Sequence, residues 1–348
     1  GMTDFYEIGV EARAARMRVL ALQALKSWGI TDCQPQLIKI RENTVFRVTT
    51  ADGTDAALRI HRHGYHSDAA LQSELSWMRA LYRDGIEVPE VVAARSGALF
   101  ITSTVESVPE RRQVDMVKWL EGEPLGSLEE GLSSAVDDIH RIFTEVGRLV
   151  ARLHNHAANW QPPPGFVRHA WDVDGLTGEA PLWGRFWEFP GLDKVQRALI
   201  ERARHVARSD LIAIDGDSQG YGLIHADFNF DNMLLHDGGV TAIDFDDCGY
   251  GWHLFDLATI SIMFRGSEDF DTVCNAVIEG YRRERPLSDE TLRQMPLFYL
   301  VRGFTYLGWI HTRSETKTAR DITDEIVDSV CELAEEYMSA REQAGGQA

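Results

Sequence analysis

The sequence predicts an α+β protein of two lobes, in which an N-terminal antiparallel sheet with one helix precedes a larger, mainly helical C-terminal lobe. Short strand-like runs separated by turn residues dominate the first third of the chain. Beyond Glu121-Gly122-Glu123-Pro124, apolar residues recur at helical spacing over long stretches. The 348 residues are enough for two lobes and a sizeable core. We therefore expect the N-terminal lobe over residues 2–120 and the C-terminal lobe over residues 121–348.

The N-terminal region begins with a predicted helix over Val10–Trp28, whose apolar side chains have helical spacing and which Gly29 ends. Ala51-Asp52-Gly53 supplies a turn between two strands. Ser67 can cap a helix that runs to about Arg83. The strands are predicted at Gln36–Ile40, Thr44–Thr50, Asp55–His61, Ala98–Ser103 and Arg112–Leu120.

The C-terminal region combines long helices with one short hairpin. The hairpin strands are Met233–Leu235 and Val240–Ile243, and Asp237-Gly238 lies in the turn between them. The aromatic-rich segment Asn159–Phe189 either packs over the helices or forms one wall of a pocket for an amine. The helices are predicted at Ala135–His156, Asp193–Arg208, Trp252–Phe264, Asp269–Arg283, Asp289–Thr312 and Asp321–Ala340.

Composition excludes several classes of partner. The net charge of −19 and the lack of any basic run argue against binding to nucleic acid or to anionic membranes, and are compatible with a cationic or zwitterionic small molecule. The longest apolar runs, such as Leu257–Phe264, are too short to span a bilayer. The four scattered cysteines form no C-x-x-C motif, which favours reduced thiols in a cytoplasmic protein.

The segment Ser209–Phe264 contains ten aspartates and neither lysine nor arginine. Carboxylates at this density repel one another unless a cation joins them, and short carboxylates on loops suit Mg²⁺ bound together with substrate phosphates. Within the segment, His225 begins an H-x-D-x-x-x-x-N pattern that ends at Asn232, and Asp244 follows the next strands. These are the base and metal positions of a phosphoryl-transfer site.

The hairpin determines how close the two predicted metal ligands lie. A turn centred on Gly238 places Asn232 opposite Asp244, roughly 5 Å away at Cβ, whereas a two-residue turn shifts the pairing by one residue. Asp227, in the loop that enters the hairpin, is the candidate base, and His225 is expected to pack inside that loop. The alternative is a polar hairpin with ordinary turn aspartates, which leaves the coincidence of these features unexplained.

A second pair of charges supports this interpretation. Glu74 lies at the edge of the apolar face of its predicted helix and needs a partner. Arg59 is a lone cation between Leu58 and Ile60 in a predicted strand. An Arg59–Glu74 pair would hold N–H donors towards a phosphate. The alternative is that the two are unrelated surface charges.

These motifs resemble those of the aminoglycoside phosphotransferase and choline kinase superfamily, which shares the bilobal protein-kinase fold. The layout is most similar to bacterial homoserine kinase-like, hydroxylysine kinase-like and stress-response Ser/Thr kinase-like branches. The resemblance is carried by Leu223–Asp227 with Asn232, by Ile243–Asp246 and by Phe255–Ala258.

The resemblance implies ATP and Mg²⁺ as cofactors. It makes Asp227 the catalytic aspartate and makes Asn232 and Asp244 the Mg²⁺ ligands. Arg59 and Glu74 would then orient the nucleotide phosphates.

The resemblance also implies roles for Asp256 and for a hinge segment, whereas those of His225, Asp246 and Asp247 are expected from the sequence itself. Asp256 would brace the backbone of the catalytic loop, with His225 as a further support. Asp246 and Asp247 would bind a substrate ammonium group or only water. The segment 116–122 would be the hinge beside the adenine, with nucleotide contacts from Met116, Lys118 and Trp119.

Two departures from the family pattern stand out. Arg59 occupies the position expected for lysine, and the loop Arg41–Thr44 has no glycine with which to cover the phosphates. Arg302, Tyr306, Trp309 and Arg313 lie together late in the chain, and the sequence leaves open whether they face the cleft.

The favoured hypothesis is an Mg²⁺/ATP-dependent O-phosphotransferase that acts on a small hydroxylated amine or amino acid. One alternative is a Ser/Thr protein kinase of the same fold. The other is a non-catalytic, nucleotide-binding pseudokinase, which the two departures motivate. The presence of Asp227, Asn232 and Asp244 together argues against the pseudokinase.

Overall fold

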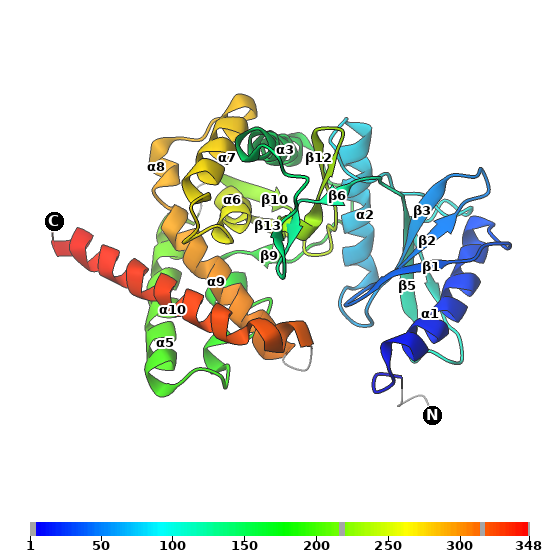
Figure 1. Cartoon of the computed structure of the whole chain (residues 1–348), viewed down its shortest axis with the longest axis horizontal. Helices are drawn as coiled ribbons and strands as arrows, with labels where there is room; N and C mark the ends of the chain where they lie inside the picture. The colour runs from blue at the N-terminus through cyan, green and yellow to red at the C-terminus, as the bar shows by residue number, and fades with distance from the viewer. Residues whose placement is uncertain (1–4, 216–219, 314–316, 347–348) are drawn as a thin grey trace.

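The computed structural model describes residues 5–215, 220–313 and 317–346. It confirms the predicted bilobal α+β fold (Figure 1). Helix α1 (Val10–Leu25) and the strands of the first lobe lie at one end of the molecule, and most helices of the second lobe gather at the other. Helix α2 (Asp68–Arg83) lies between the two groups.

A five-stranded antiparallel sheet with the strand order β1-β2-β3-β5-β4 forms the first lobe. Alternate side chains of a strand point to opposite faces, and one face packs against α1 through Leu58 and Met116. The predicted strands are confirmed, with ends that differ by one or two residues. They are β1 (Gln36–Ile40), β2 (Thr44–Thr49), β3 (Asp55–Ile60), β4 (Phe100–Ser103) and β5 (Arg112–Lys118).

Helix α2 begins where predicted, because the Ser67 hydroxyl accepts a hydrogen bond from the Ala70 N–H at 3.1 Å. Its apolar side chains belong to the hydrophobic core of the second lobe, whereas α1 and the sheet form a separate core. Trp77 of α2 contacts Phe245 edge-to-face, with ring centroids 5.7 Å apart. Glu74, on the same helix, is therefore positioned by packing against the second lobe.

Two glycines set the closest helix packing in the second lobe. A Cβ on Gly280 of α7 would lie 1.9 Å from the carbonyl oxygen of Thr144 on α3, and one on Gly147 would lie 2.1 Å from that of Val277. The helices of this lobe are α3 (Ile139–Asn159), α4 (Val173–Thr177), α5 (Lys194–Ile214), α6 (His253–Ile262), α7 (Phe270–Glu284), α8 (Asp289–Leu292), α9 (Met295–Thr312) and α10 (Lys317–Gly346).

The single helix expected over Asp289–Thr312 was wrong, because the segment forms two helices. Helix α8 ends at Leu292 and α9 begins at Met295. Pro296 occupies the first turn of α9, where a residue without an N–H loses no helical hydrogen bond, and this favours a new helix start.

The predicted hairpin has a two-residue turn. Asp237 and Gly238 both have positive φ, 49° and 79°, as a type I′ turn requires. The N–H of Ile243 donates to the carbonyl oxygen of Asn232 at 2.9 Å, so Ile243 and not Asp244 faces Asn232. The pairing of Asn232 with Asp244, expected for a turn centred on Gly238, is therefore corrected by one residue. The short strands of this lobe are β6 (Glu123–Pro124), β7 (Gly126–Ser127), β8 (Gly131–Leu132), β9 (Ala170–Trp171), β10 (Tyr221–Ile224), β11 (Met233–His236), β12 (Gly239–Ala242) and β13 (Gly249–Trp252).

The aromatic segment 159–189 mainly packs against the helices. Trp171, Phe186 and Trp187 are buried in the core, and the Phe186 ring stacks on Phe304 of α9 at 4.4 Å. Trp183 is only half-buried and contacts Trp171 edge-to-face.

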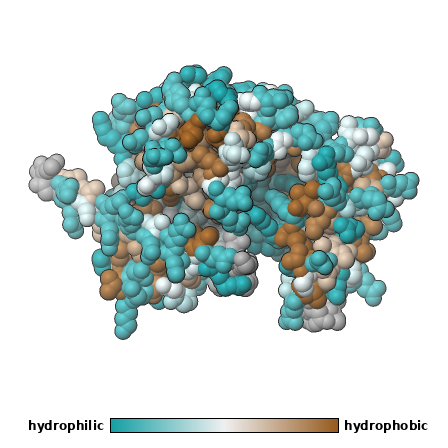
Figure 2. All heavy atoms as spheres, in the orientation of Figure 1, coloured by the Kyte–Doolittle hydropathy of each residue, from teal (hydrophilic) through white to brown (hydrophobic). Residues whose placement is uncertain are grey.

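The molecular surface is mostly hydrophilic. The face drawn in Figure 2 shows hydrophobic residues in small patches and is hollowed between the two lobes. None of the helices in the described ranges has the length and apolar composition needed to cross a membrane.

Candidate active site

Asp256 of α6 holds the loop that leads into the hairpin. Its carboxylate accepts hydrogen bonds from the backbone N–H groups of His225 (3.2 Å) and Ala226 (2.8 Å) and contacts Nε2 of His154 at 2.8 Å. Ala226 has a φ of 71°, a conformation that an L-residue with a side chain rarely adopts. Burial raises the pKa of Asp256 to about 6. This carboxylate therefore fixes an unusual backbone turn directly before Asp227.

His225 ties the same loop to the strand that precedes Asp244. The Asp227 N–H donates to Nδ1 of His225 at 3.1 Å, so Nε2 must carry the ring proton. Nε2 donates to the carbonyl oxygen of Ile243 at 2.8 Å. Burial lowers the pKa of His225, which favours this neutral form.

Three donors surround the Asp227 carboxylate. Oδ2 accepts from Nδ2 of Asn232 at 3.0 Å, and Oδ1 accepts from Nδ2 of Asn229 at 3.2 Å and from Nη2 of Arg302 at 3.1 Å. The side chain retains 16% exposure. Burial, reinforced by the charge of Asp247 and opposed by Arg302, raises the pKa of Asp227 well above that of an ordinary aspartate.

Asn232 and Asp244 offer oxygen ligands that fit Mg²⁺. Asn232 uses Nδ2 for Asp227, which leaves its amide oxygen Oδ1 for another partner. Asp244 follows β12 with a φ of 58°, and its Oδ1 accepts only a long bond of 3.3 Å from the Asp246 N–H among the hydrogen bonds of the described residues. One carboxylate and one amide oxygen, completed by phosphate and water, are the donor set that Mg²⁺ prefers.

The expected ion pair between Arg59 and Glu74 is present, with Nη2 of Arg59 3.1 Å from Oε2 of Glu74. Asp115 of β5 is a second partner, which accepts from Nε at 2.7 Å and from Nη2 at 3.0 Å. None of these bonds uses Nη1 of Arg59. Sequence reasoning missed Asp115, although a carboxylate between Val114 and Met116 in an apolar strand signals a buried partner.

Asp246 is buried close to Glu74 and His66. It is 6% exposed, and its carbonyl oxygen accepts from Nε2 of His66 at 2.7 Å and from Nη2 of Arg168 at 2.8 Å. The expectation that it binds substrate is corrected, because its side chain points into the buried cluster around Glu74. Donor atoms of His66, Glu74 and Asp246 lie within 4.8 Å of one another, but Arg59 and Arg168 already supply positive charge there.

Asp247 remains half-buried beside the site. Its Oδ1 accepts from the Tyr65 hydroxyl at 2.6 Å, which links the β3–α2 connection to the second lobe. Burial and the charge of Asp246 raise the pKa of Asp247 to about 7.

The residues of the predicted hinge make contacts within the first lobe. Met116 packs on the α1 face of the sheet, so its side chain and that of Arg59 lie on opposite faces. Nζ of Lys118 lies 3.1 Å from Glu90 at the surface. The Trp119 ring lies 4.4 Å from the guanidinium of Arg47.

One face of α9 lines the site. The sequence alone left open whether the residues of this face point towards the cleft. Arg302 is fully buried and contacts Asp227, while Arg313, eleven residues later, forms an ion pair with Glu42 in the β1–β2 loop. Tyr306 and Trp309 are half-buried and lie between them on the same helix face. The helix therefore spans from the catalytic loop to the loop of the first lobe.

Side chains anchor the glycine-free β1–β2 loop. Besides the Glu42–Arg313 pair, Nη1 of Arg41 lies 3.9 Å from Asp231 of the second lobe. Oδ1 of Asn43 accepts from the N–H of Arg62 at 3.1 Å. The loop thus bridges the two lobes beside the candidate metal ligands.

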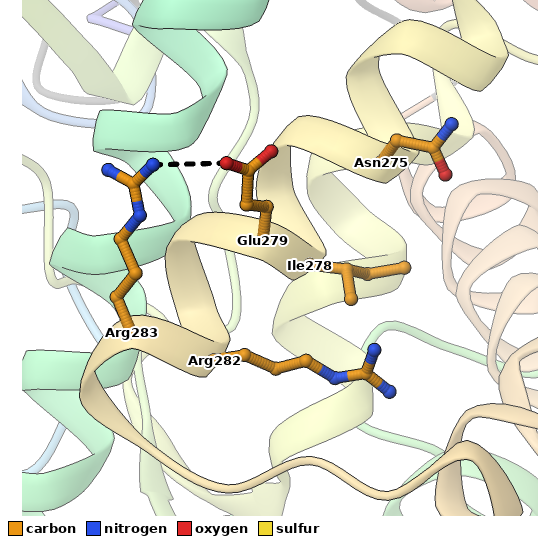
Figure 3. A pocket seen from close by; sticks show the side chains of 5 residues that line it. All are labelled: Asn275, Ile278, Glu279, Arg282 and Arg283. Carbon is orange, nitrogen blue, oxygen red and sulfur yellow. Dashed lines mark hydrogen bonds and ion pairs between the residues drawn. The ribbon is translucent and has the colours of Figure 1, made fainter.

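A hollow of about 420 Å³ on the outer face of α7 is separate from this site. Figure 3 shows its lining, in which Glu279 and Arg283 pair with each other at 3.0 Å. None of its lining residues belongs to the catalytic loop, the hairpin or α9.

Comparison with known proteins places the chain among kinases. The model of the family described as "Phosphotransferase enzyme family" matches residues 36–290. Amicoumacin kinase of Bacillus subtilis is 24% identical over 312 residues, which cover 86% of each chain. A structure of a microcompartment-associated aminopropanol kinase is similar with a TM-score of 0.79 and 29% identity, and the match covers 93% of this chain and 98% of that one. An amicoumacin kinase in complex with AMP-PNP, Ca²⁺ and Ami has a TM-score of 0.72 and 20% identity, over 93% and 96% of the two chains.

Proposed function

Because this chain belongs to the phosphotransferase enzyme family and is an ATP-dependent kinase, we propose that it transfers the γ-phosphoryl group of Mg²⁺-bound ATP to the hydroxyl group of a small hydroxylated amine or amino acid. The observation that carries this proposal is the joint placement of Asp227 and Asn232, hydrogen-bonded at 3.0 Å, beside Asp244 at the end of the hairpin.

The residues have distinct roles in the proposed reaction. The acceptor oxygen attacks the γ-phosphorus as the bond to ADP breaks, and Asp227 orients the hydroxyl and finally takes its proton. Asn232 and Asp244 would hold Mg²⁺, which neutralises charge on the phosphates when it is bound. Arg59, fixed by Glu74 and Asp115, directs Nη1 towards the phosphates.

The surroundings of Asp227 favour a cationic or zwitterionic acceptor. Asp247 and Glu42 add negative charge near Asp227, and Tyr306 and Trp309 supply aromatic surface on α9. The similarity to a kinase named for aminopropanol, a molecule with both an amine and a hydroxyl group, supports this class.

Two contacts that join the lobes beside the site favour a small acceptor over a protein. The ion pair of Glu42 with Arg313 and the hydrogen bond of Tyr65 to Asp247 both join the lobes next to the site. A protein segment would need an open groove at this position, whereas a small molecule can be enclosed.

ADP release from Mg²⁺-ATP over a panel of acceptors tests the proposal. The panel comprises aminopropanol, ethanolamine, choline, homoserine, hydroxylysine, several aminoglycosides, amicoumacin and a generic protein. The expected result is turnover with a small acceptor that is lost in Asp227→Asn and kept in Asp231→Asn, which changes a nearby half-buried carboxylate. Preferential transfer to the protein would favour a protein kinase. Binding of ATP without transfer to any member would favour the pseudokinase.

A further inference from the structure

Helix α9 places the guanidinium of Arg302 directly against the Asp227 carboxylate. Nη2 of Arg302 donates to Oδ1 of Asp227 at 3.1 Å, and Nη1 donates to the carbonyl oxygen of Ala226 at 3.0 Å. The Arg302 side chain is fully buried. Over the described ranges, Asp227 is the only carboxylate that pairs with it.

An aromatic cage encloses this guanidinium. Its central carbon lies 4.7 Å from the ring centre of Tyr306, 4.9 Å from that of Phe255 and 5.1 Å from that of Trp183. Aromatic faces attract a cation, but they do not replace the hydrogen bonds that water provides. Nε is buried and has no hydrogen-bond partner among the described residues. An apolar side chain would fill this space without the desolvation penalty of a buried charge, so stability alone does not explain an arginine here.

The backbone of Ala226, directly before Asp227, is held through both its N–H and its carbonyl group. The N–H of Ala226 donates to Asp256 of α6 at 2.8 Å, and its carbonyl oxygen accepts from Arg302 of α9 at 3.0 Å. Ala226 has a φ of 71°, so its backbone stays in this conformation only where its surroundings enforce it. Arg302 therefore contacts both the backbone that enters Asp227 and the carboxylate of Asp227.

We propose that Arg302 is a positioning residue for phosphoryl transfer, which fixes the Asp227 carboxylate in the orientation that faces the acceptor hydroxyl. Arg302 acts through Asp227 and contacts neither nucleotide nor acceptor. The inference rests on the proposed function of Asp227. It adds to the family's motif residues a further residue from α9, 75 positions away in the sequence.

Two substitutions and a matched control separate this role from a structural one. Arg302→Met keeps most of the apolar stem and removes the charge and the donors, while Arg302→Lys keeps the charge but makes only one of the two bonds. The control is Arg204→Met. Arg204 of α5 is also buried, lies 3.7 Å from the centre of the Trp187 ring and donates to the carbonyl oxygen of Thr177, and it has no contact with Asp227 in the described parts of the chain.

The readouts are ADP release from Mg²⁺-ATP, with aminopropanol or water as acceptor, and the ATP dissociation constant from calorimetry. We expect kcat of Arg302→Met to fall about 100-fold, because a misplaced base loses alignment, while ATP affinity changes less than about twofold, since nucleotide binding does not use Arg302. Arg302→Lys should lose about tenfold. Guanidinium chloride, at concentrations far below those that unfold the protein, should restore part of the kcat of Arg302→Met. Adding Arg302→Met to Asp227→Asn should cause no further loss of activity.

Other outcomes overturn the inference. A wild-type kcat in Arg302→Lys or Arg302→Met, an equal loss in Arg204→Met, or a parallel loss of ATP affinity would each show that Arg302 does not position the base. If Arg302→Met fails to fold, the kcat of Arg302→Lys decides. A wild-type protein that releases no ADP with water or with any acceptor of the panel would instead contradict the proposed function.

Discussion

Arg59 and Asp115 face each other directly on strands β3 and β5, and the guanidinium donates two hydrogen bonds to the carboxylate, from Nε at 2.7 Å and from Nη2 at 3.0 Å. A lysine, with its single ammonium group, could not form this planar two-bond contact. Asp115 therefore explains how arginine is accommodated at the position where the family pattern has lysine. Since Glu74 takes the remaining Nη2 bond, the two carboxylates hold the guanidinium without using Nη1.

Asp115→Asn should weaken both the fold and ATP binding. The substitution leaves the charges of Arg59 and His61 partly unpaired in a buried site, and breaking such a pair costs about 3 kcal/mol of unfolding free energy. Urea unfolding and calorimetric ATP binding measure the two effects. Asp55→Asn, which breaks the half-exposed pair with Arg47, is the control and should cost less than about 1 kcal/mol. Equal losses of unfolding free energy in the two variants would contradict the interpretation that Asp115, Arg59 and His61 form a buried ion-pair network.

Asp244→Asn should abolish most turnover and leave the fold intact. Asparagine tolerates the φ of 58° at this position but lacks the charge that holds Mg²⁺. We expect kcat to fall at least about 100-fold with an unchanged melting temperature, and chelation of Mg²⁺ should stop the wild-type reaction. Asp237→Asn, at another aspartate with positive φ, should remain fully active. Comparable activity in Asp244→Asn would remove Asp244 from the metal site.

His169 makes a pH-dependent contribution to stability. Burial lowers its pKa to about 4, whereas an unfolded histidine titrates near 6.5. Between these two pKa values the unfolded chain binds the proton and the folded protein does not. The contribution of His169 to the unfolding free energy is therefore complete above about pH 6.5 and is lost as the pH falls towards 4. Relative to His169→Gln, which does not titrate, the unfolding free energy of the wild type should fall by about 1.4 kcal/mol per pH unit. Denaturant unfolding between pH 7 and pH 5, in steps of about half a unit, measures this slope. A constant difference would show that folding does not shift the pKa of His169.

Gly280→Ala should separate helices α3 and α7. The new methyl group would lie 1.9 Å from the carbonyl oxygen of Thr144, and the backbone of a packed helix cannot yield cheaply. We expect a loss of about 1–3 kcal/mol in unfolding free energy. At Gly303 of α9 the nearest atom, 3.2 Å away, is the flexible end of Leu333, so Gly303→Ala should change stability by less than about 1 kcal/mol. A larger loss in Gly303→Ala than in Gly280→Ala would contradict this packing.

The sequence by itself determined the features that depend on local pattern. The five strands of the first lobe, the Ser67 cap of α2 and the catalytic hairpin follow from periodicity, capping and turn chemistry over a few residues. The spacing from His225 to Asn232 likewise lies within one loop. The pair of Arg59 and Glu74 was predictable because each is a lone charge in an apolar element.

Only the tertiary structure decided which distant residues meet. Asp115 joins Arg59 from another strand, Arg302 reaches Asp227 from a helix 75 residues later, and Arg313 pairs with Glu42 across the lobes. Asp246, for which the sequence left a substrate ammonium group or only water as alternatives, is buried beside Glu74. The physical reason is that a periodic pattern reports which face of an element is buried, whereas the partner of a buried charge depends on how elements far apart in the chain pack together.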